Sequence, residues 1–202
     1  RYLRAKGATS TGVVGLADFD DRAVLAAVAA GVKRETFAAG VAGEIAGLAA
    51  RLGVGPDVAF VRASPDWERM AGVARKLLSK GLAYEKLRSV YFDVVRDQEY
   101  GVLAKVDPAK LSLGKTVDLD DYAKENPRDF TLLKRTNLRD LKTGDFVKTE
   151  WGNVRPSWYL QMAAAGASGS GLDVVLAGNV HRFPHLDNLR SLWRFGCGFE
   201  PK

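Results

Sequence analysis

Hydrophobic and polar residues in the first third of the chain recur in a strand–helix–helix pattern. Residues 12–16 form a short apolar run with β-branched side chains, which predicts a buried strand. Asp20 and Asp21 precede the apolar positions at 23–28, and acidic residues favour the positive N-terminal end of a helix. A second helix is expected from 34 to 52, because its apolar residues follow helical spacing.

The pattern changes twice along the rest of the chain. Ser64 and Pro65 predict an N-cap followed by proline at the first helical position, in a helix that ends before Gly81. Residues 84–150 contain short apolar runs separated by turns, which is typical of strands. Residues 172–178 read as a core strand and residues 184–195 as a closing helix.

Composition indicates one globular unit in a reducing compartment. The chain has 202 residues, of which 47% are apolar, so it can bury a substantial core. We expect no membrane span, because no apolar run approaches the roughly 20 residues that one needs. A single cysteine, Cys197, rules out an internal disulfide framework and suits the cytoplasm or an organelle matrix.

The chain carries an excess of positive charge. Its net charge is +6 and its pI is about 9.5, which permits RNA binding through a basic surface but is equally common in proteins that bind none. The basic residues that we single out lie near the two ends of the sequence: Arg1, Arg4, Lys6, Arg182, Arg190 and Arg194.

Five short segments occur in the order in which one enzyme family has them. They are DFDDR at 18–22, VYFDV at 90–94, KENPRDF at 124–130, EWGNVRPSW at 150–158 and FPHLDN at 183–188. These segments resemble TDVDDK, VYFDV, KxNPxDF, SPWGxGRPGW and FPHHEN of the cysteinyl-tRNA synthetase family. The resemblance implies an α/β fold, namely part of a Rossmann-like class I synthetase catalytic domain with an inserted, β-rich connective segment. It divides the chain into residues 1–83, 84–150 and 151–202.

The resemblance also implies an amino-acid pocket whose chemistry has changed. His185 matches one zinc ligand of the family, whereas Met162 and Leu189 stand where the family has a cysteine and a glutamate. Trp158 matches a residue that lines the amino-acid pocket, and Ala17 stands in place of a threonine. Because a zinc site needs about four N, S or O donors, we expect no metal here.

His181, His185 and Cys197 are a weak alternative metal set. Pro184 lies between the two histidines and disfavours a regular helix through both. We therefore expect packing roles for these side chains.

The segment that matches the family's nucleotide loop is also altered. Of three glycines the chain keeps Gly178, next to Asn179, while Leu176 and Ala177 replace the others. The family's HIGH-type and KMSKS-type ATP signatures are not among the 202 residues. The segment is then either an ordinary sheet edge or a weakened nucleotide pocket, and we expect no cofactor: both zinc and ATP binding would be lost.

Three functions remain open, and whether the chain is an enzyme is undecided, with the substitutions favouring a non-enzyme. The first is a non-catalytic structural subunit of a larger assembly, such as the ribonucleoprotein of an organellar ribosome. The second is part of a divergent ATP-dependent aminoacyl-tRNA ligase of the cysteine type, with its ATP signatures outside these residues. The third is a regulatory protein that senses an amino acid. Because the expected parallel sheet lacks its first strand, we also expect one unpaired sheet edge that a partner protein or RNA covers.

Overall fold

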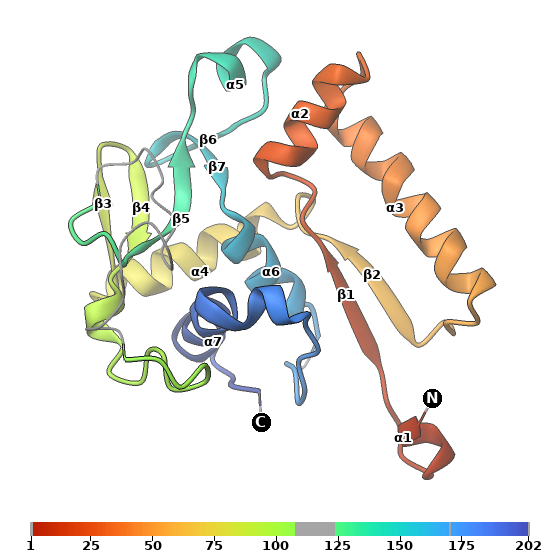
Figure 1. The fold of residues 1–202 in the computed structure, drawn as a ribbon. Coiled ribbons are helices and arrows are strands. Elements are labelled where there is room, and N and C mark those ends of the chain that lie inside the picture. The colour runs from red at the N-terminus through yellow and green to blue at the C-terminus, as the bar shows by residue number, and fades with distance from the viewer. Residues whose placement is uncertain (1, 108–123, 170, 202) are drawn as a thin grey trace.

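A computed structural model describes residues 2–107, 124–169 and 171–201, without the side chain of Arg4 (Figure 1). Its helices are α1 (Tyr2–Ala5), α2 (Asp21–Ala29), α3 (Arg34–Arg51), α4 (Trp67–Ser79), α5 (Leu138–Thr143), α6 (Trp158–Gly166) and α7 (Asp187–Ser191). Its strands are β1 (Gly12–Leu16), β2 (Val58–Arg62), β3 (Ala83–Lys86), β4 (Ser89–Phe92), β5 (Phe130–Arg135), β6 (Val147–Thr149) and β7 (Gly152–Pro156).

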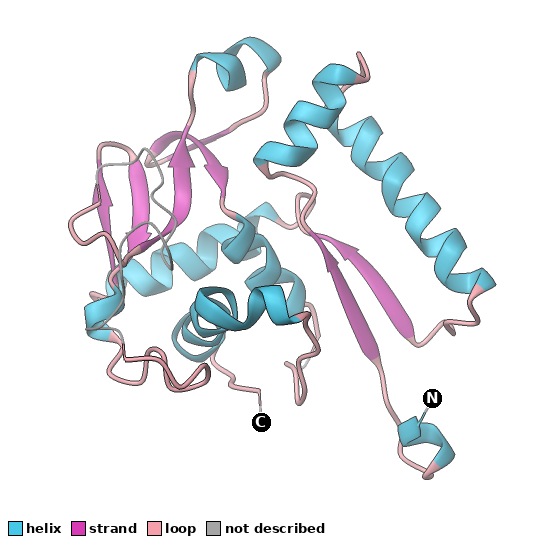
Figure 2. Cartoon of the chain, in the orientation of Figure 1, coloured by secondary structure: helices cyan, strands magenta, loops and turns pink. Residues whose placement is uncertain are grey.

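Two sheets make up a mixed α/β fold, and they are separate (Figure 2). β1 and β2 pair in parallel, and β1 also packs against α6. The strand expected at 12–16 is confirmed, but the expected burial is wrong, because Val13 and Val14 are each 38% exposed. A parallel strand is buried only when both faces are covered, and within the described residues β1 has no strand neighbour except β2.

The expected start of α4 is wrong by two residues. Ser64 does not cap the helix: its backbone N–H and its hydroxyl donate to Asp18, at 2.8 and 2.6 Å, which holds its side chain against the turn after β1. Asp66 caps instead, by accepting from the N–H of Arg69, and the helix begins at Trp67. Its end is as expected, with Gly81 in the left-handed region at φ +66°.

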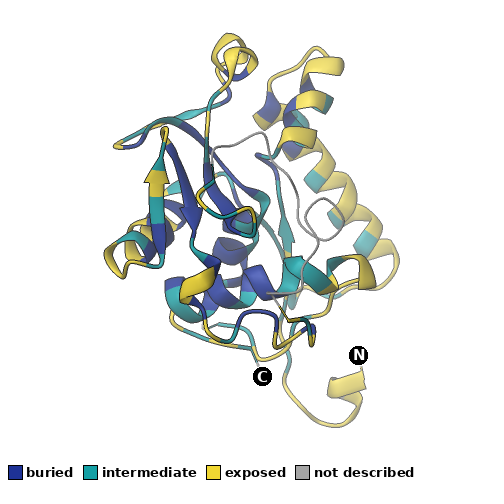
Figure 3. Cartoon of the chain, turned by 60° about the vertical axis from the view of Figure 1, so that its left-hand side comes forward, coloured by how far each residue is buried: buried dark blue, intermediate teal, exposed yellow. Residues whose placement is uncertain are grey.

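The second sheet is antiparallel with the strand order β3-β4-β5-β7-β6. It begins at Ala83 and ends at Pro156, slightly outside residues 84–150, the range that the sequence resemblance implies for an insertion. Together with α4, α6 and the C-terminal segment it encloses the main core, shown in dark blue in Figure 3. Fully buried side chains of that core include Met70, Leu77, Phe92, Leu132, Leu160 and Leu192.

The strand expected at 172–178 is wrong. This segment is irregular, and Val174 and Leu176 are 65% and 93% exposed. No described strand lies beside it, so its backbone has no ladder to join. The closing helix is confirmed in outline: α7 continues into a π-helical turn at Leu192–Cys197. Before α7 the chain is kinked, with Phe183 extended at φ −141° and ψ 137° and a cis Phe183–Pro184 bond.

One face of the parallel unit leaves apolar side chains in solvent. On α3 they form a stripe of Val41, Ile45, Leu48 and Leu52, the last just past the helix end. Contiguous exposed apolar side chains of this kind are a candidate interaction surface. In the described part of the chain, no helix is long and apolar enough to cross a membrane.

Two of the three arginines expected to form a basic surface near the C-terminal helix are ion-paired within the chain. Arg190 pairs with Glu99 and Glu200, and Arg194 pairs with Glu99 at 2.7 Å. Both guanidinium groups are therefore neutralised within the chain. Arg182 is exposed, Arg1 lies outside the described residues, and the side chain of Arg4 is not described.

Candidate functional site

The turn after β1 is fixed by buried polar contacts. Asp18 is 5% exposed and accepts hydrogen bonds from Ser64 and from the Nε of Arg62, at 2.8 Å. The N–H of Phe19 donates to the side-chain amide of Gln161 on α6, at 2.9 Å. Because Gln161 is fully buried, this bond fixes the first turns of α6 against the end of β1. Ala17 lies within that turn.

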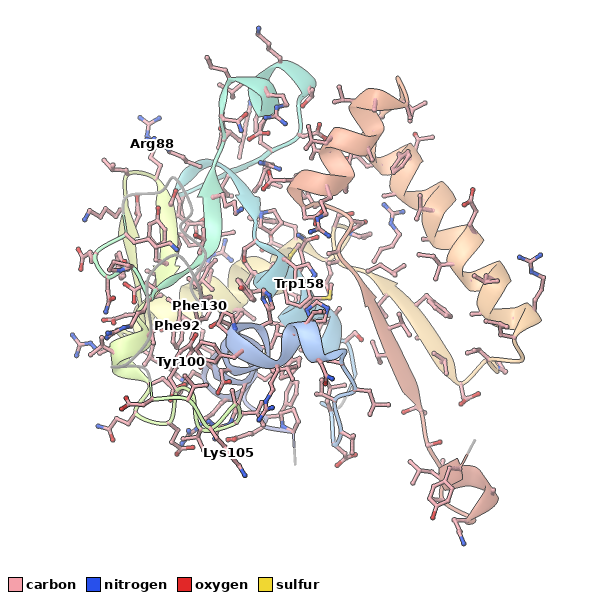
Figure 4. The ribbon with its side chains drawn as sticks, viewed as in Figure 1. Arg88, Phe92, Tyr100, Lys105, Phe130 and Trp158 are labelled. Carbon is pink, nitrogen blue, oxygen red and sulfur yellow. The ribbon has the colours of Figure 1, made fainter. Side chains whose placement is uncertain are left out.

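An aromatic cluster forms where α6 meets the C-terminal segment (Figure 4 labels Trp158). The rings of Trp158 and His181 are stacked, with centroids 5.4 Å apart and planes 8° apart. The ring of His185 meets Trp158 edge-on at 5.7 Å, and its Nδ1 shares a 2.9 Å hydrogen bond with the hydroxyl of Tyr159. The Nδ1 of His181 is buried without a hydrogen-bond partner in the described structure.

Met162 and Leu189 lie one helical turn beyond Trp158 and His185. Met162 packs against β1: its Sδ would be 3.1 Å from a Cβ placed on Gly15. Leu189 is 5% exposed and belongs to the core. These residues do not fit a zinc ion, since of the three matched positions only His185 carries a nitrogen donor. Among the described residues, no group of three or more His, Cys, Asp or Glu side chains is placed to hold a metal.

Gly178 and Asn179 lie at the exposed end of the irregular segment. The carbonyl of Gly178 accepts from the N–H of His181 at 2.9 Å, which closes a short 3-10 turn that begins at Asn179. A Cβ on Gly178 would meet nothing closer than Val180, at 3.9 Å. The chain itself therefore does not require glycine here, and Leu176 projects into solvent.

Buried ion pairs join the parallel unit to the antiparallel sheet. Arg34 of α3 is 5% exposed and donates to Asp145 at 3.2 Å and to the carbonyl of Asp18 at 2.9 Å. Arg155 of β7 pairs with Asp140 at 3.0 Å and also with Asp21 at the start of α2. Removing one partner of such a pair leaves an uncompensated buried charge, which is strongly destabilising.

Burial raises the pKa of three side chains: Asp129, Tyr84 and Cys197. The carboxylate of Asp129 accepts from the hydroxyl of Tyr84 at 2.7 Å. Both line an open cleft of about 620 Å³ on the antiparallel sheet. The cleft contains none of the expected pocket or nucleotide-loop residues, but it includes Asp93 of the VYFDV segment and Asp129 of the KENPRDF segment. Burial also raises the pKa of the Cys197 thiol to about 11, so the thiol is neutral at pH 7.

Of the residues expected from sequence, the structure brings Trp158 and His185 into direct contact. Met162 lies on α6 and Leu189 on α7, whereas Gly178 and Asn179 lie on the exposed loop before His181. Tyr159 and Gln161 were not singled out from the sequence, and His181 was considered only as part of an alternative metal set. Two adjacent aromatic residues at a helix start, Trp158 and Tyr159, could have indicated an aromatic cluster. Only the fold shows that His181 stacks on Trp158.

Comparison with known proteins gives one consistent match. The family described as "tRNA synthetases class I (C) catalytic domain" matches residues 1–197. A cysteine–tRNA ligase of Methanosarcina mazei is 34% identical over 178 residues, which are 87% of this chain and 38% of that protein. A cysteine–tRNA ligase of Thermotoga maritima is 31% identical over 194 residues, 95% of this chain and 41% of that protein. The chain thus spans about two-fifths of the length of these relatives.

Proposed function

Because the chain belongs to the class I cysteinyl-tRNA synthetase catalytic-domain family, we propose that it forms the amino-acid-binding part of a tRNA ligase of the cysteine type. In this proposal the ATP-binding signatures are contributed by segments outside the 202 residues. We place this function before that of a non-catalytic structural subunit, because the relatives found are cysteine–tRNA ligases.

The observation that carries the proposal is the aromatic cluster at the N-terminus of α6. Trp158 and Tyr159 lie against His181 and His185, beside the turn that Asp18 and Gln161 hold in place. A small amino acid could contact the partly exposed rings of this cluster. The Nδ1 of His181 is buried, so it could bond a ligand only if the His181 ring turned away from Trp158. Since Met162 and Leu189 supply no metal donors, side-chain recognition here would depend on packing rather than on a metal–thiolate bond.

A zinc-free pocket has a predictable weakness. An apolar pocket distinguishes two ligands that differ by one methylene by only about 1–3 kcal/mol, and it rejects an added hydroxyl equally poorly. We therefore expect cysteine, serine and alanine to bind this chain with affinities within roughly 100-fold of one another.

Titration calorimetry on the 202-residue chain tests the proposal without requiring ATP. Cysteine, serine and alanine would each be titrated into the unaltered chain, Trp158→Ala and the control Trp67→Ala, whose ring packs on the outside of the core. The proposal expects binding that Trp158→Ala abolishes and Trp67→Ala retains. Failure of the unaltered chain to bind any of the three amino acids at millimolar concentration would remove its support.

The second candidate is a non-catalytic subunit of a larger protein or RNA–protein assembly. It is favoured by Met162 and Leu189 at the positions of zinc ligands and by the exposed apolar stripe on α3. This candidate predicts no amino-acid binding and co-sedimentation of the native protein with a larger particle. An amino-acid-sensing role, the third function left open by the sequence, shares the binding test but predicts no association with tRNA.

A further inference from the structure

We propose that one end of the antiparallel sheet is a docking surface for the phosphate backbone of RNA. It is formed by the tip of the β3–β4 hairpin, the end of β5, α5 and β6. We call its five exposed cationic side chains the basic rim: Arg88, Arg135, Arg139, Lys142 and Lys148. That the RNA is a tRNA rests on the proposed function.

The rim residues come from separate parts of the sequence, but the sheet places them together. The N–H of Arg135 donates to the hydroxyl of Ser89, the residue after Arg88. The side chain of Arg88 lies over Gly152, with its Cδ 3.5 Å from a Cβ placed there. Gly152 and Asn153 pair with Thr149 and Lys148 of β6. Figure 4 shows Arg88 at the hairpin tip, directed away from the sheet.

The acidic residues of the same segment are turned inward. Between residues 134 and 149 the carboxylates are Asp140 and Asp145, and both are buried. Asp140 pairs with Arg155, and Asp145 pairs with Arg34. On the flanks, Glu150 pairs with Arg75, while Glu85 of β3 is the one exposed carboxylate of the β3–β4 hairpin.

The five rim cations therefore lie in solvent without a carboxylate partner in the described part of the chain. Like charges gathered at one end of a sheet repel one another, and a polyanion relieves that repulsion while releasing its own counterions. This distinguishes the rim from Arg190 and Arg194, which Glu99 and Glu200 already neutralise.

The backbone at the hairpin tip is a second observation. Leu87 and Arg88 have φ angles of +51° and +64°, the left-handed region that a two-residue turn of this type requires. Asparagine and glycine adopt this conformation most readily, whereas a residue with a long side chain costs about 1–2 kcal/mol there. The turn nevertheless places a guanidinium group at its tip, and unfavourable backbone conformations of this kind cluster at binding sites.

Fluorescence anisotropy with a labelled tRNA transcript for cysteine tests the rim, without ATP or amino acid. The rim variant is Arg88→Gln/Arg139→Gln/Lys148→Gln. The control, Arg22→Gln/Lys33→Gln/Arg51→Gln, removes the same charge from exposed positions around α2 and α3. Affinity would be measured from 50 to 400 mM KCl, and urea midpoints would establish that both variants fold.

The rim variant should reduce the slope of log K against log salt by about 2–3, since each phosphate contact contributes about 0.7–0.9. Its affinity at 100 mM KCl should fall at least ten-fold, while the control should stay close to the unaltered chain. The inference is overturned if the unaltered chain does not bind the transcript at 50 mM KCl, or if the two variants behave alike. Equal, rim-dependent binding of polyglutamate would overturn the assignment to RNA. The rim variant should bind amino acids as the unaltered chain does, so a failed amino-acid titration counts against the proposed function alone.

Discussion

Arg34→Met should be among the most destabilising single changes in this protein. The methionine keeps much of the apolar volume of the arginine but removes every donor. Arg34 donates to Asp145 at 3.2 Å and to the carbonyl of Asp18 at 2.9 Å, and its guanidinium lies 3.8 Å from the centroid of the Phe19 ring. The Asp145 side chain is 11% exposed, so its charge would lose this partner while remaining out of water. We expect the free energy of unfolding to fall by about 3–5 kcal/mol.

The double variant Arg34→Met/Asp145→Leu separates the charge from the packing. Replacing both partners of a buried pair by apolar residues is often neutral, so the part of the loss caused by Asp145 should be recovered. A deficit of about 1–3 kcal/mol should remain, because the carbonyl of Asp18 still lacks its donor.

Urea unfolding followed by tryptophan fluorescence measures these differences. Arg51→Met at the exposed C-terminal end of α3 is the matched control and should change the free energy by less than about 0.5 kcal/mol. A loss below about 1 kcal/mol for Arg34→Met would refute the reasoning. So would a double variant whose loss equals the sum of the two single losses.

Three further results are expected. Burial raises the pKa of Asp129 above 3.8 in the folded chain. Its contribution to the free energy of unfolding is therefore greatest at low pH and is lost as the pH rises through the raised pKa. Urea unfolding between pH 4 and 8 should show a smaller decline in stability for Asp129→Asn than for the unaltered chain. With a pKa near 11 against a reference of 9.0, Cys197 should react with iodoacetamide at pH 8 roughly 100-fold more slowly than in the urea-unfolded chain. Elemental analysis of purified protein should give far less than one zinc per chain, and a stoichiometric ion would contradict the assignment of Met162 and Leu189 as non-ligands.

The sequence was sufficient to predict those helices and strands that depend on contacts between residues close together in the chain. The helices at Asp21–Ala29 and Arg34–Arg51 follow from apolar spacing and acidic first turns, and the strand at Gly12–Leu16 follows from its β-branched run. The prediction failed where a residue far away in the sequence determines the local structure. Ser64 has the chemistry of an N-cap, but Asp18, 46 residues earlier, holds its side chain through two hydrogen bonds, and Asp66 caps the helix instead.

The irregular segment at 172–178 shows the same limit for strands. Its composition suits a core strand, but a strand exists only when a neighbour offers a ladder, and none does so among the described residues. The aromatic cluster also depends on residues that are far apart in the sequence. Trp158 and His185 were recognised from sequence, yet the stacking of His181 on Trp158 depends on how the C-terminal segment returns to α6.

Gly15 and Met162 explain how the altered ligand position is accommodated, and they give a last prediction. A Cβ on Gly15 would lie 3.1 Å from both the Sδ of Met162 and the Cβ of Ala165, so only glycine lets α6 approach β1 this closely. Gly15→Ala should therefore cost about 1–3 kcal/mol of unfolding free energy. Met162 lies at the end of a flexible side chain, so Met162→Ala should remove part of the overlap, and the loss in the double variant should be smaller than the sum of the single losses. Strictly additive losses in urea unfolding would show that Met162 does not occupy this space. A negative coupling would mean that the side chain at the former ligand position now serves to pack α6, and with it Trp158, against β1.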